Sequence, residues 1–154
     1  MDITKILAPS AVKFVGSVSS KKRLLQDLGD IAASCYGFDP VEATEALLER
    51  ETLGPTGVGH GIALPHAKLD GIDSVHGAFF RIERPMDFDA VDRQPVDLVF
   101  ALFAPKNSGV EHLKALAVVS RTLRDAAICE KLRANTDQAT LHAVLTESPT
   151  NQAA

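Results

Sequence analysis

Hydrophobic residues recur with helical spacing in two adjoining segments of the first third of the chain. From residue 20 to 35 they lie three or four positions apart, which predicts an amphipathic helix closed by Gly37. A second helix is predicted to begin at Asp39-Pro40, because aspartate can cap a helix and proline suits its first position. This helix stops before Gly54-Pro55. Residues 1–19 are predicted to be irregular or weakly extended, with a short strand near Val12, Phe14 and Val18.

The middle of the chain has patterns typical of strands. Short strands are predicted at residues 62–64 and 74–83, and a turn with a short extended piece at 85–92. Residues 96–104 form a nearly continuous hydrophobic run of strand length, which predicts a central strand covered on both faces.

The last third of the chain returns to helical patterns. Ser108 and Glu111 form the sequence of a capping box, which predicts a helix through about Arg124. Two shorter helices are predicted at residues 126–134 and 137–146, before a polar tail. The order of helices, strands and helices predicts a mixed α/β fold in which one sheet is sandwiched between helices. We expect a single domain over residues 1–154, with a core from about 3 to 146.

Composition and charge exclude several classes of function. The 154 residues have a formal net charge of −4, no tryptophan and one tyrosine, which argues against nucleic-acid binding. The chain has no signal-peptide pattern, and its longest hydrophobic run is too short to cross a membrane. Its two cysteines form no Cys-x-x-Cys motif, as suits a reducing compartment. We therefore expect a soluble cytoplasmic protein without membrane insertion.

The glycine-rich passage 54–61 is the first candidate for a ligand site. Gly54 and Gly59 have the separation of a Walker A loop, but His60 follows instead of lysine. The passage also follows a helix and enters a strand, the reverse of a dinucleotide fingerprint. Glycine still allows backbone N–H groups to approach an anion, so a phosphate could bind at Gly57, Val58 and Gly59. A flexible connection is the alternative interpretation.

Two histidines and an arginine are the candidates for chemistry. Pro65 favours extended geometry before His66 and lacks a donor, so we expect His66 at a strand end, outside regular pairing, with its ring available. His112 falls in the first turn of its predicted helix, where the dipole favours anions and a neutral imidazole. Arg50 ends the second helix, and its planar fork matches phosphate oxygens. For each of the three, the alternative is a residue without a functional role.

Other uses of the histidines have less support. His60, His66 and His76 have neither the His-Glu-x-x-His spacing nor any Cys/His zinc pattern, so we expect no metal. A Ser-His-Asp hydrolase is excluded by the lack of a Gly-x-Ser-x-Gly elbow.

Several motifs in the same order resemble the fructose/mannitol family of phosphotransferase enzyme IIA domains. They are Leu-Glu-Arg-Glu (48–51), Gly-Pro-Thr-Gly-Val-Gly (54–59), Gly-Ile-Ala-Leu-Pro-His-Ala-Lys (61–68), Phe-Asp-Ala-Val-Asp (88–92), Pro-Val-Asp-Leu-Val-Phe-Ala-Leu (95–102) and Glu-His-Leu (111–113). The resemblance covers about residues 3–146. It implies a mixed sheet between helices, an HPr-like phosphocarrier as donor, and no metal, nucleotide or other cofactor.

The resemblance also assigns roles to the candidates. It implies that His66 accepts a phosphoryl group on Nε2, that His112 assists by positioning and charge, and that Arg50 lines the same site. Backbone groups from Gly57 to Gly59 and the charge of Lys68 are expected to assist. His60 stands where relatives often have asparagine, and Lys114 where some have a further histidine.

Within this family, the segment from Phe88 to Leu102 is most similar to nitrogen-regulatory enzyme IIA. This likeness implies a signalling role, with regulated targets such as transporters or kinases. Two alternatives stay open. One is a sugar-transport enzyme IIA that passes phosphate to a separate IIB component. The other is an interaction module that binds its partners without being phosphorylated.

Overall fold

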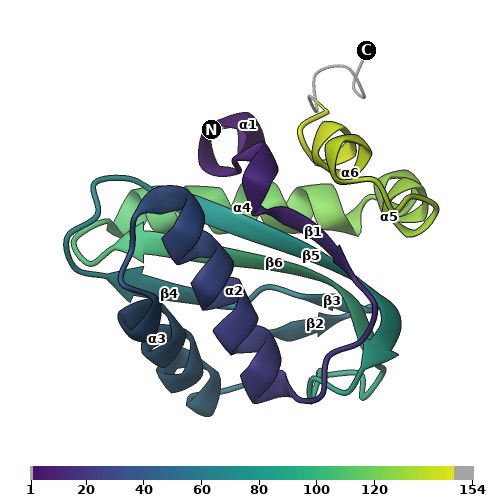
Figure 1. The fold of residues 1–154 in the computed structure, drawn as a ribbon, viewed down its shortest axis with the longest axis horizontal. Helices are drawn as coiled ribbons and strands as arrows, with labels where there is room; N and C mark the ends of the chain where they lie inside the picture. The colour runs from purple at the N-terminus through teal and green to yellow at the C-terminus, as the bar shows by residue number, and fades with distance from the viewer. Residues whose placement is uncertain (1, 148–154) are drawn as a thin grey trace.

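A six-stranded mixed sheet forms the centre of the molecule (Figure 1). The computed structural model describes residues 2–147. In chain order the elements are α1 (Ile3–Ile6), η1 (Pro9–Ala11), β1 (Val12–Val15), α2 (Lys21–Tyr36), α3 (Pro40–Thr52), β2 (Gly57–Gly59), β3 (Ile62–Ala63), β4 (His66–Leu69), β5 (His76–Met86), β6 (Val96–Pro105), α4 (Gly109–Arg124), α5 (Ala126–Arg133) and α6 (Gln138–Leu145).

Strand β6 lies at the centre of the sheet. It pairs antiparallel with β5 on one side, and parallel with both β3 and β4 on the other. Strand β1 adds to β5 in parallel, and the short β2 forms the opposite edge beside β3. Residues 98–104 of β6 are all fully buried, which confirms the central strand predicted from their hydrophobic run.

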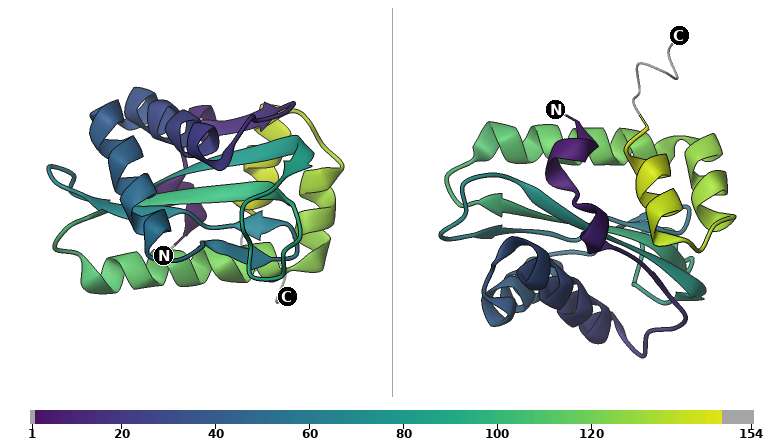
Figure 2. Two further views of the ribbon diagram at one scale, coloured as in Figure 1. Left: turned by 90° about the horizontal axis from the view of Figure 1, so that it is seen from below. Right: turned by 45° about the horizontal axis from the view of Figure 1, so that its top comes forward.

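Helices cover both faces of the sheet. Figure 2 shows α2 and α3 on one face and the long helix α4 on the other, with α5 and α6 gathered at one end. This arrangement confirms the predicted sheet sandwiched between helices. Each covering helix turns a hydrophobic stripe toward the sheet, as the spacing of its hydrophobic residues requires.

The ends of α2 and α3 follow from their capping residues. The Ser20 side chain accepts a hydrogen bond from the N–H of Arg23 at the start of α2. Gly37 closes that helix in the left-handed conformation, with φ of 79°. The carboxylate of Asp39 accepts from the first N–H groups of α3, as its sequence position predicts.

The predicted capping box of α4 does not form. Ser108 is the N-cap residue, but its hydroxyl donates to the carbonyl of Pro105 at 2.8 Å and caps no N–H of the helix. The helix itself has the predicted extent. The sequence pattern missed the short helix α1, and it put the start of β5 two residues early and its end three residues early.

Two further predictions concern membrane crossing and the polar tail. No helix within residues 2–147 combines the length and the hydrophobicity that crossing a membrane requires. Nearly all of the predicted polar tail, residues 148–154, lies outside the described residues.

Candidate active site

His66 is the first residue of β4, and it pairs with Leu102 of β6. The prediction that it lies outside regular strand pairing is therefore wrong. Pro65 lacks a donor of its own, but its carbonyl accepts a hydrogen bond from the N–H of Leu102 at 2.9 Å. Strands β3 and β4 both run along β6 in one register, with Leu64 and Pro65 between them.

A hydrogen bond to the backbone of Leu64 fixes the ring of His66. The carbonyl of Leu64 lies 2.9 Å from Nδ1 of His66. A carbonyl can only accept, so this contact requires the proton on Nδ1 and leaves Nε2 with a free electron pair. The geometry therefore favours Nε2 as the nucleophilic nitrogen of the neutral ring.

His112 comes to His66 from α4, which covers the face of the sheet opposite α2 and α3. It is the fourth residue of α4, and it is only 8% exposed. The two imidazole rings have their centroids 5.3 Å apart at an interplanar angle of 51°. Among the described residues, Nδ1 of His112 has no hydrogen-bond partner although it is buried. A buried polar atom without a partner is unusual and is often explained by a functional role.

Burial keeps both rings neutral near physiological pH. It is the main cause that lowers the pKa of His66, with a further contribution from the positive charge of Arg50. The hydrogen bond to Leu64 and the charge of Glu51 oppose that shift. The pKa of His112 is lowered by burial, and then by the charges of His66 and Lys68. Neutral rings retain the electron pairs that nucleophilic attack requires.

Positive side chains surround the two rings. A cavity of about 430 Å³ contains His66 and His112 together with Arg50, Lys68 and Lys106. Arg50 lies in the last turn of α3, and its Nη1 donates to the carbonyl of Gly54 at 3.0 Å. Lys68 is exposed two residues along β4 from His66, so both side chains leave the same face of the strand. The arrangement offers permanent cations for an anionic group beside a neutral nucleophile.

The structure brings together four of the seven residues predicted for the site, and it places the other three elsewhere. Gly57, Val58 and Gly59 form β2, and none of them lines the cavity of His66. Gly57 packs against Ala90, since a Cβ there would lie 2.8 Å from that side chain. Val58 and Gly59 instead line a separate cavity of about 930 Å³ between β2–β3 and α4–α5. The glycines therefore serve close packing of this edge of the sheet rather than the histidine pair.

Sequence reasoning missed Glu49 and Lys106, which also line the cavity. Lys106 follows β6 directly and precedes α4, and it pairs with Asp70 at 3.0 Å. Lys106 could have been found from the strand pairing, because the parallel pairing of β4 with β6 brings the end of β6 near the segment that follows His66. Within residues 2–147, no three His, Cys, Asp or Glu side chains form a group that could hold a metal ion.

Comparison with known proteins decides the family. The family model described as "Phosphoenolpyruvate-dependent sugar phosphotransferase system, EIIA 2" matches residues 5–148. The chain belongs to this family. Proteins of the family transfer phosphoryl groups, and the chain is a homologue of the nitrogen-regulatory members.

Relatives and solved structures agree with this placement of the EIIA chain. A nitrogen regulatory protein of Bradyrhizobium diazoefficiens is 46% identical over 153 residues, covering 99% of this chain and all of the relative. The crystal structure of nitrogen regulatory protein IIA-Ntr from Neisseria meningitidis is 35% identical, with a TM-score of 0.87 and coverage of 94% and 99% of the two chains. IIA mannitol from Escherichia coli, at 22% identity, shares the fold with a TM-score of 0.76 over 90% and 97%.

Proposed function

We propose that this protein is a nitrogen-type regulatory enzyme IIA. It accepts a phosphoryl group from an HPr-like phosphocarrier on Nε2 of His66, and it regulates target proteins, such as transporters or kinases, according to its phosphorylation state. The observation that carries the proposal is the hydrogen bond from Nδ1 of His66 to the carbonyl of Leu64, which leaves Nε2 free beside His112 and Arg50. The identity to nitrogen regulatory proteins favours the regulatory branch.

The transfer begins with a neutral His66. Its Nε2 electron pair attacks the phosphorus of the donor's phosphohistidine, in line with the bond that breaks. A new P–N bond forms to His66, and the electron pair of the old P–N bond returns to the donor ring. Nδ1 keeps its proton and its hydrogen bond to Leu64 throughout. Such a transfer needs positioning and charge stabilisation, and the donor already supplies the reactive phosphoryl group.

The other cavity residues act on the phosphoryl oxygens. Arg50 and Lys68 supply positive charge as the group passes between two nitrogens. The ring of His112 donates a hydrogen bond to a phosphoryl oxygen, as its closeness to the ring of His66 allows.

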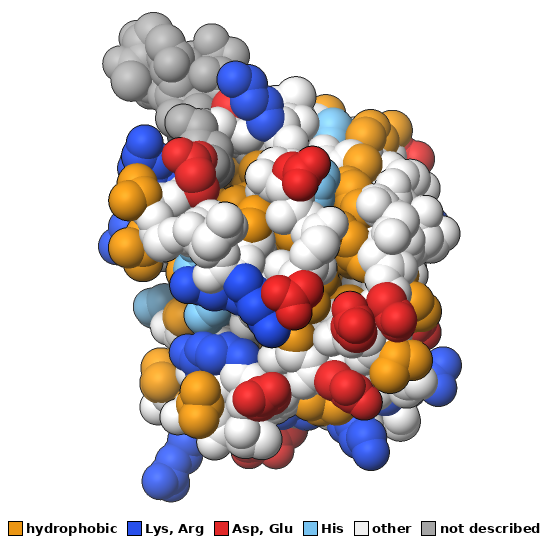
Figure 3. All heavy atoms as spheres, turned by 90° about the vertical axis from the view of Figure 1, so that its left-hand side faces the viewer, with side chains coloured by type: hydrophobic (Ala, Val, Ile, Leu, Met, Phe, Trp, Pro, Cys, Tyr) orange, Lys and Arg blue, Asp and Glu red, His pale blue; other side chains and the backbone are white. Residues whose placement is uncertain are grey.

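A hydrophobic surface suited to the carrier surrounds the cavity. Leu53, which follows α3, is 81% exposed, and Val110 and Leu113 at the start of α4 are 64% and 65% exposed. The side of the molecule at which β6 ends and α4 begins faces the viewer in Figure 3, where hydrophobic side chains lie around neighbouring histidine and Lys/Arg side chains. Exposed hydrophobic groups of this kind mark interaction surfaces.

The proposal is tested by incubating the purified protein with a phosphorylated HPr-like carrier. We expect one acid-labile phosphate per chain on the wild type and none on His66→Ala. The control is His142→Ala, which removes a histidine whose ring bonds the carbonyl of Leu7 away from the cavity. Stoichiometric phosphate on His66→Ala would overturn the assignment.

The regulatory branch is tested separately, because its chemistry at His66 is shared with sugar transport. Labelled phosphoprotein is mixed with purified IIB domains, and the phosphate on each protein is followed over time. A nitrogen-type regulator retains its label, whereas a sugar-transport enzyme IIA transfers it to the IIB domain. Rapid transfer to a IIB domain would contradict the regulatory proposal and leave the phosphorylation of His66 intact.

A further inference from the structure

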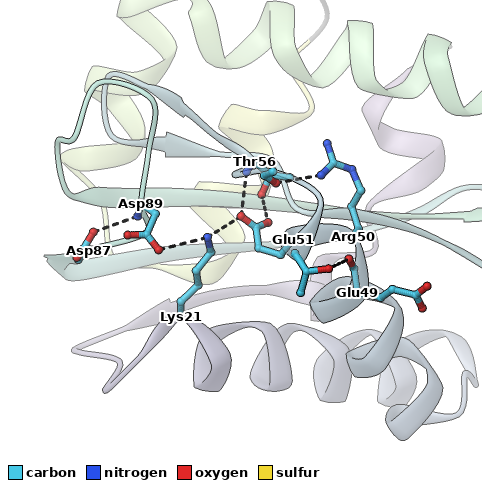
Figure 4. A network of polar contacts seen from close by, with 9 residues as sticks. Lys21, Glu49, Arg50, Glu51, Thr56, Asp87 and Asp89 are labelled. Carbon is cyan, nitrogen blue, oxygen red and sulfur yellow. Dashed lines mark hydrogen bonds and ion pairs between the residues drawn. The ribbon is translucent and has the colours of Figure 1, made fainter.

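Glu51, next to Arg50 in the last turn of α3, lies in a cluster of polar contacts beneath the site (Figure 4). Its side chain is only 7% exposed, and Lys21 approaches one carboxylate oxygen at 2.7 Å. The same oxygen accepts from the N–H of Thr56 at 2.9 Å, and the other accepts from the Thr56 hydroxyl at 2.5 Å. Both donors of Thr56 are therefore held by one carboxylate.

A continuous series of hydrogen bonds leads from that carboxylate to His66. The carbonyl of Thr56 accepts from the N–H of Leu64 at 2.9 Å. The carbonyl of the same Leu64 accepts from Nδ1 of His66, also at 2.9 Å. Glu51 thus fixes Thr56, Thr56 fixes the peptide of Leu64, and Leu64 fixes the histidine ring.

The position of Leu64 makes this support necessary. Leu64 lies between the segments that pair with β6, and its N–H donates to the carbonyl of Thr56 on the side away from β6. Arg50 adds to the same support, because its bond to the carbonyl of Gly54 holds the other end of the connection that carries Thr56. The connection from α3 to β2 is therefore anchored by two adjacent side chains of α3.

We propose that Glu51 is a positioning residue that keeps His66 in the Nδ1–H tautomer with Nε2 free. The effect on phosphoryl transfer rests on the function proposed above, whereas the effect on the tautomer does not. The negative charge of Glu51 has a second, smaller influence in favour of the imidazolium form of His66. Lys21 pairs with that charge. The length of the Glu51 side chain and its hydrogen bonds, not its charge, therefore give Glu51 its positioning role.

Two substitutions separate reach from charge. Glu51→Asp keeps the carboxylate but is one methylene shorter, so it loses contact with Thr56. Glu51→Gln loses the charge but keeps the length, and its amide can accept from the N–H of Thr56 and donate to the hydroxyl. We expect the conservative Gln variant to behave like the wild type and the Asp variant to lose the effect. Glu45→Gln is the matched control, because Glu45 is an exposed residue of the same helix.

The measurement is the pair of ring ¹⁵N chemical shifts of His66 in the full chain, recorded by NMR above the pKa of the ring. Wild type, Glu51→Gln and Glu45→Gln should show a protonated Nδ1 and an unprotonated Nε2. In Glu51→Asp the shifts should move toward the Nε2–H tautomer. Phosphate uptake from the carrier should be roughly tenfold slower for Glu51→Asp, as expected for a misplaced reacting group.

Two results would overturn the inference. One is a Glu51→Asp variant with the ring shifts of the wild type. The other is a Glu51→Gln variant that loses the Nδ1–H tautomer as fully as Glu51→Asp does, because the charge of Glu51 would then be responsible. If a folded Glu51→Asp protein cannot be obtained, Thr56→Val decides: it removes the hydroxyl bond, and unchanged shifts there would also refute the role. A wild type that takes up no phosphate would refute the proposed function and leave this comparison valid.

Discussion

The clearest kinetic prediction concerns His112→Ala. In the proposed mechanism the ring of His112 donates one hydrogen bond to a phosphoryl oxygen during transfer to His66. The two ring centroids lie 5.3 Å apart, so a phosphoryl group bound to one ring is within reach of the other. Alanine removes the donor and leaves His66, Arg50 and Lys68 in place.

The size of the effect follows from the environment of the ring. Removing one preorganised donor from a water-excluded site costs about 10²- to 10³-fold in rate. His112 is 8% exposed, but the cavity opens to water at the exposed Lys68. Water can replace part of the lost interaction, so we expect a decrease of about 10- to 100-fold, or about 1.4 to 2.8 kcal/mol in the transition state.

Stability should change much less than rate. Truncating a buried ring removes favourable packing, but it also removes the unpaired Nδ1, whose burial costs about 1 to 3 kcal/mol. The two terms oppose each other, so we expect a net loss below about 1.5 kcal/mol. For a chain of this size that is a decrease in Tm of at most about 6 °C.

The assay is single-turnover transfer from a phosphorylated carrier, quenched on the millisecond scale and followed by the label on the EIIA chain. Lys114→Ala is the matched control, since Lys114 is exposed on the same helix and pairs with Glu111 at 4.0 Å. His112→Ala should be slow and fully phosphorylated at completion, whereas Lys114→Ala should match the wild type. A folded His112→Ala protein that transfers at the wild-type rate would refute the role of the second histidine.

Two further predictions concern stability. Burial lowers the pKa values of His66 and His112 below 6.5, so at acidic pH the unfolded chain binds more protons than the folded chain. The stability that the two neutral rings contribute is therefore complete above pH 6.5, and it is lost as the pH falls through the folded pKa values. Urea unfolding between about pH 7 and pH 5.5 should show this decrease, and a double glutamine variant that loses stability as steeply as the wild type would contradict it. Arg133 donates two hydrogen bonds, both of 2.9 Å, to the carboxylate of Asp97. A double-mutant cycle of Arg133→Met and Asp97→Asn should give a coupling free energy of about 1 to 2 kcal/mol, with phosphate uptake unchanged. A coupling near zero would show that this partly exposed pair does not stabilise the packing of α5.

Much of the fold could be predicted because local rules and burial agree. The hydrophobic run of β6 predicted a strand buried on both faces, and all of residues 98–104 are fully buried. Asp39 and Gly37 marked helix ends through hydrogen bonding and a left-handed backbone that the structure contains. Ser108 shows the limit of such motifs, since its hydroxyl donates to the carbonyl of Pro105 and accepts from no N–H at the start of α4.

The site was predicted less completely, because its geometry depends on strand pairing between distant segments. Proximity of His66 and His112 arises from packing of β4 and α4 around β6, and a resemblance, not spacing, connected the two in the sequence. The glycine passage was misleading for the same reason. Gly57 is small because Ala90 packs against it, a contact that no local pattern contains.

The hydrogen bonds around Leu64 connect the ring of His66 to the segment before β2. The carbonyl of Leu64 accepts from the ring two residues later, and the N–H of Leu64 donates to Thr56. The carbonyl of Pro65 accepts from Leu102, and pairing with β6 continues in the same register at His66. The Leu64 peptide is bonded to Thr56, and Thr56 is bonded to Glu51. If His66 is the acceptor that we propose, its tautomer therefore depends on the hydrogen bonds of Leu64 and on the side chain that holds Thr56.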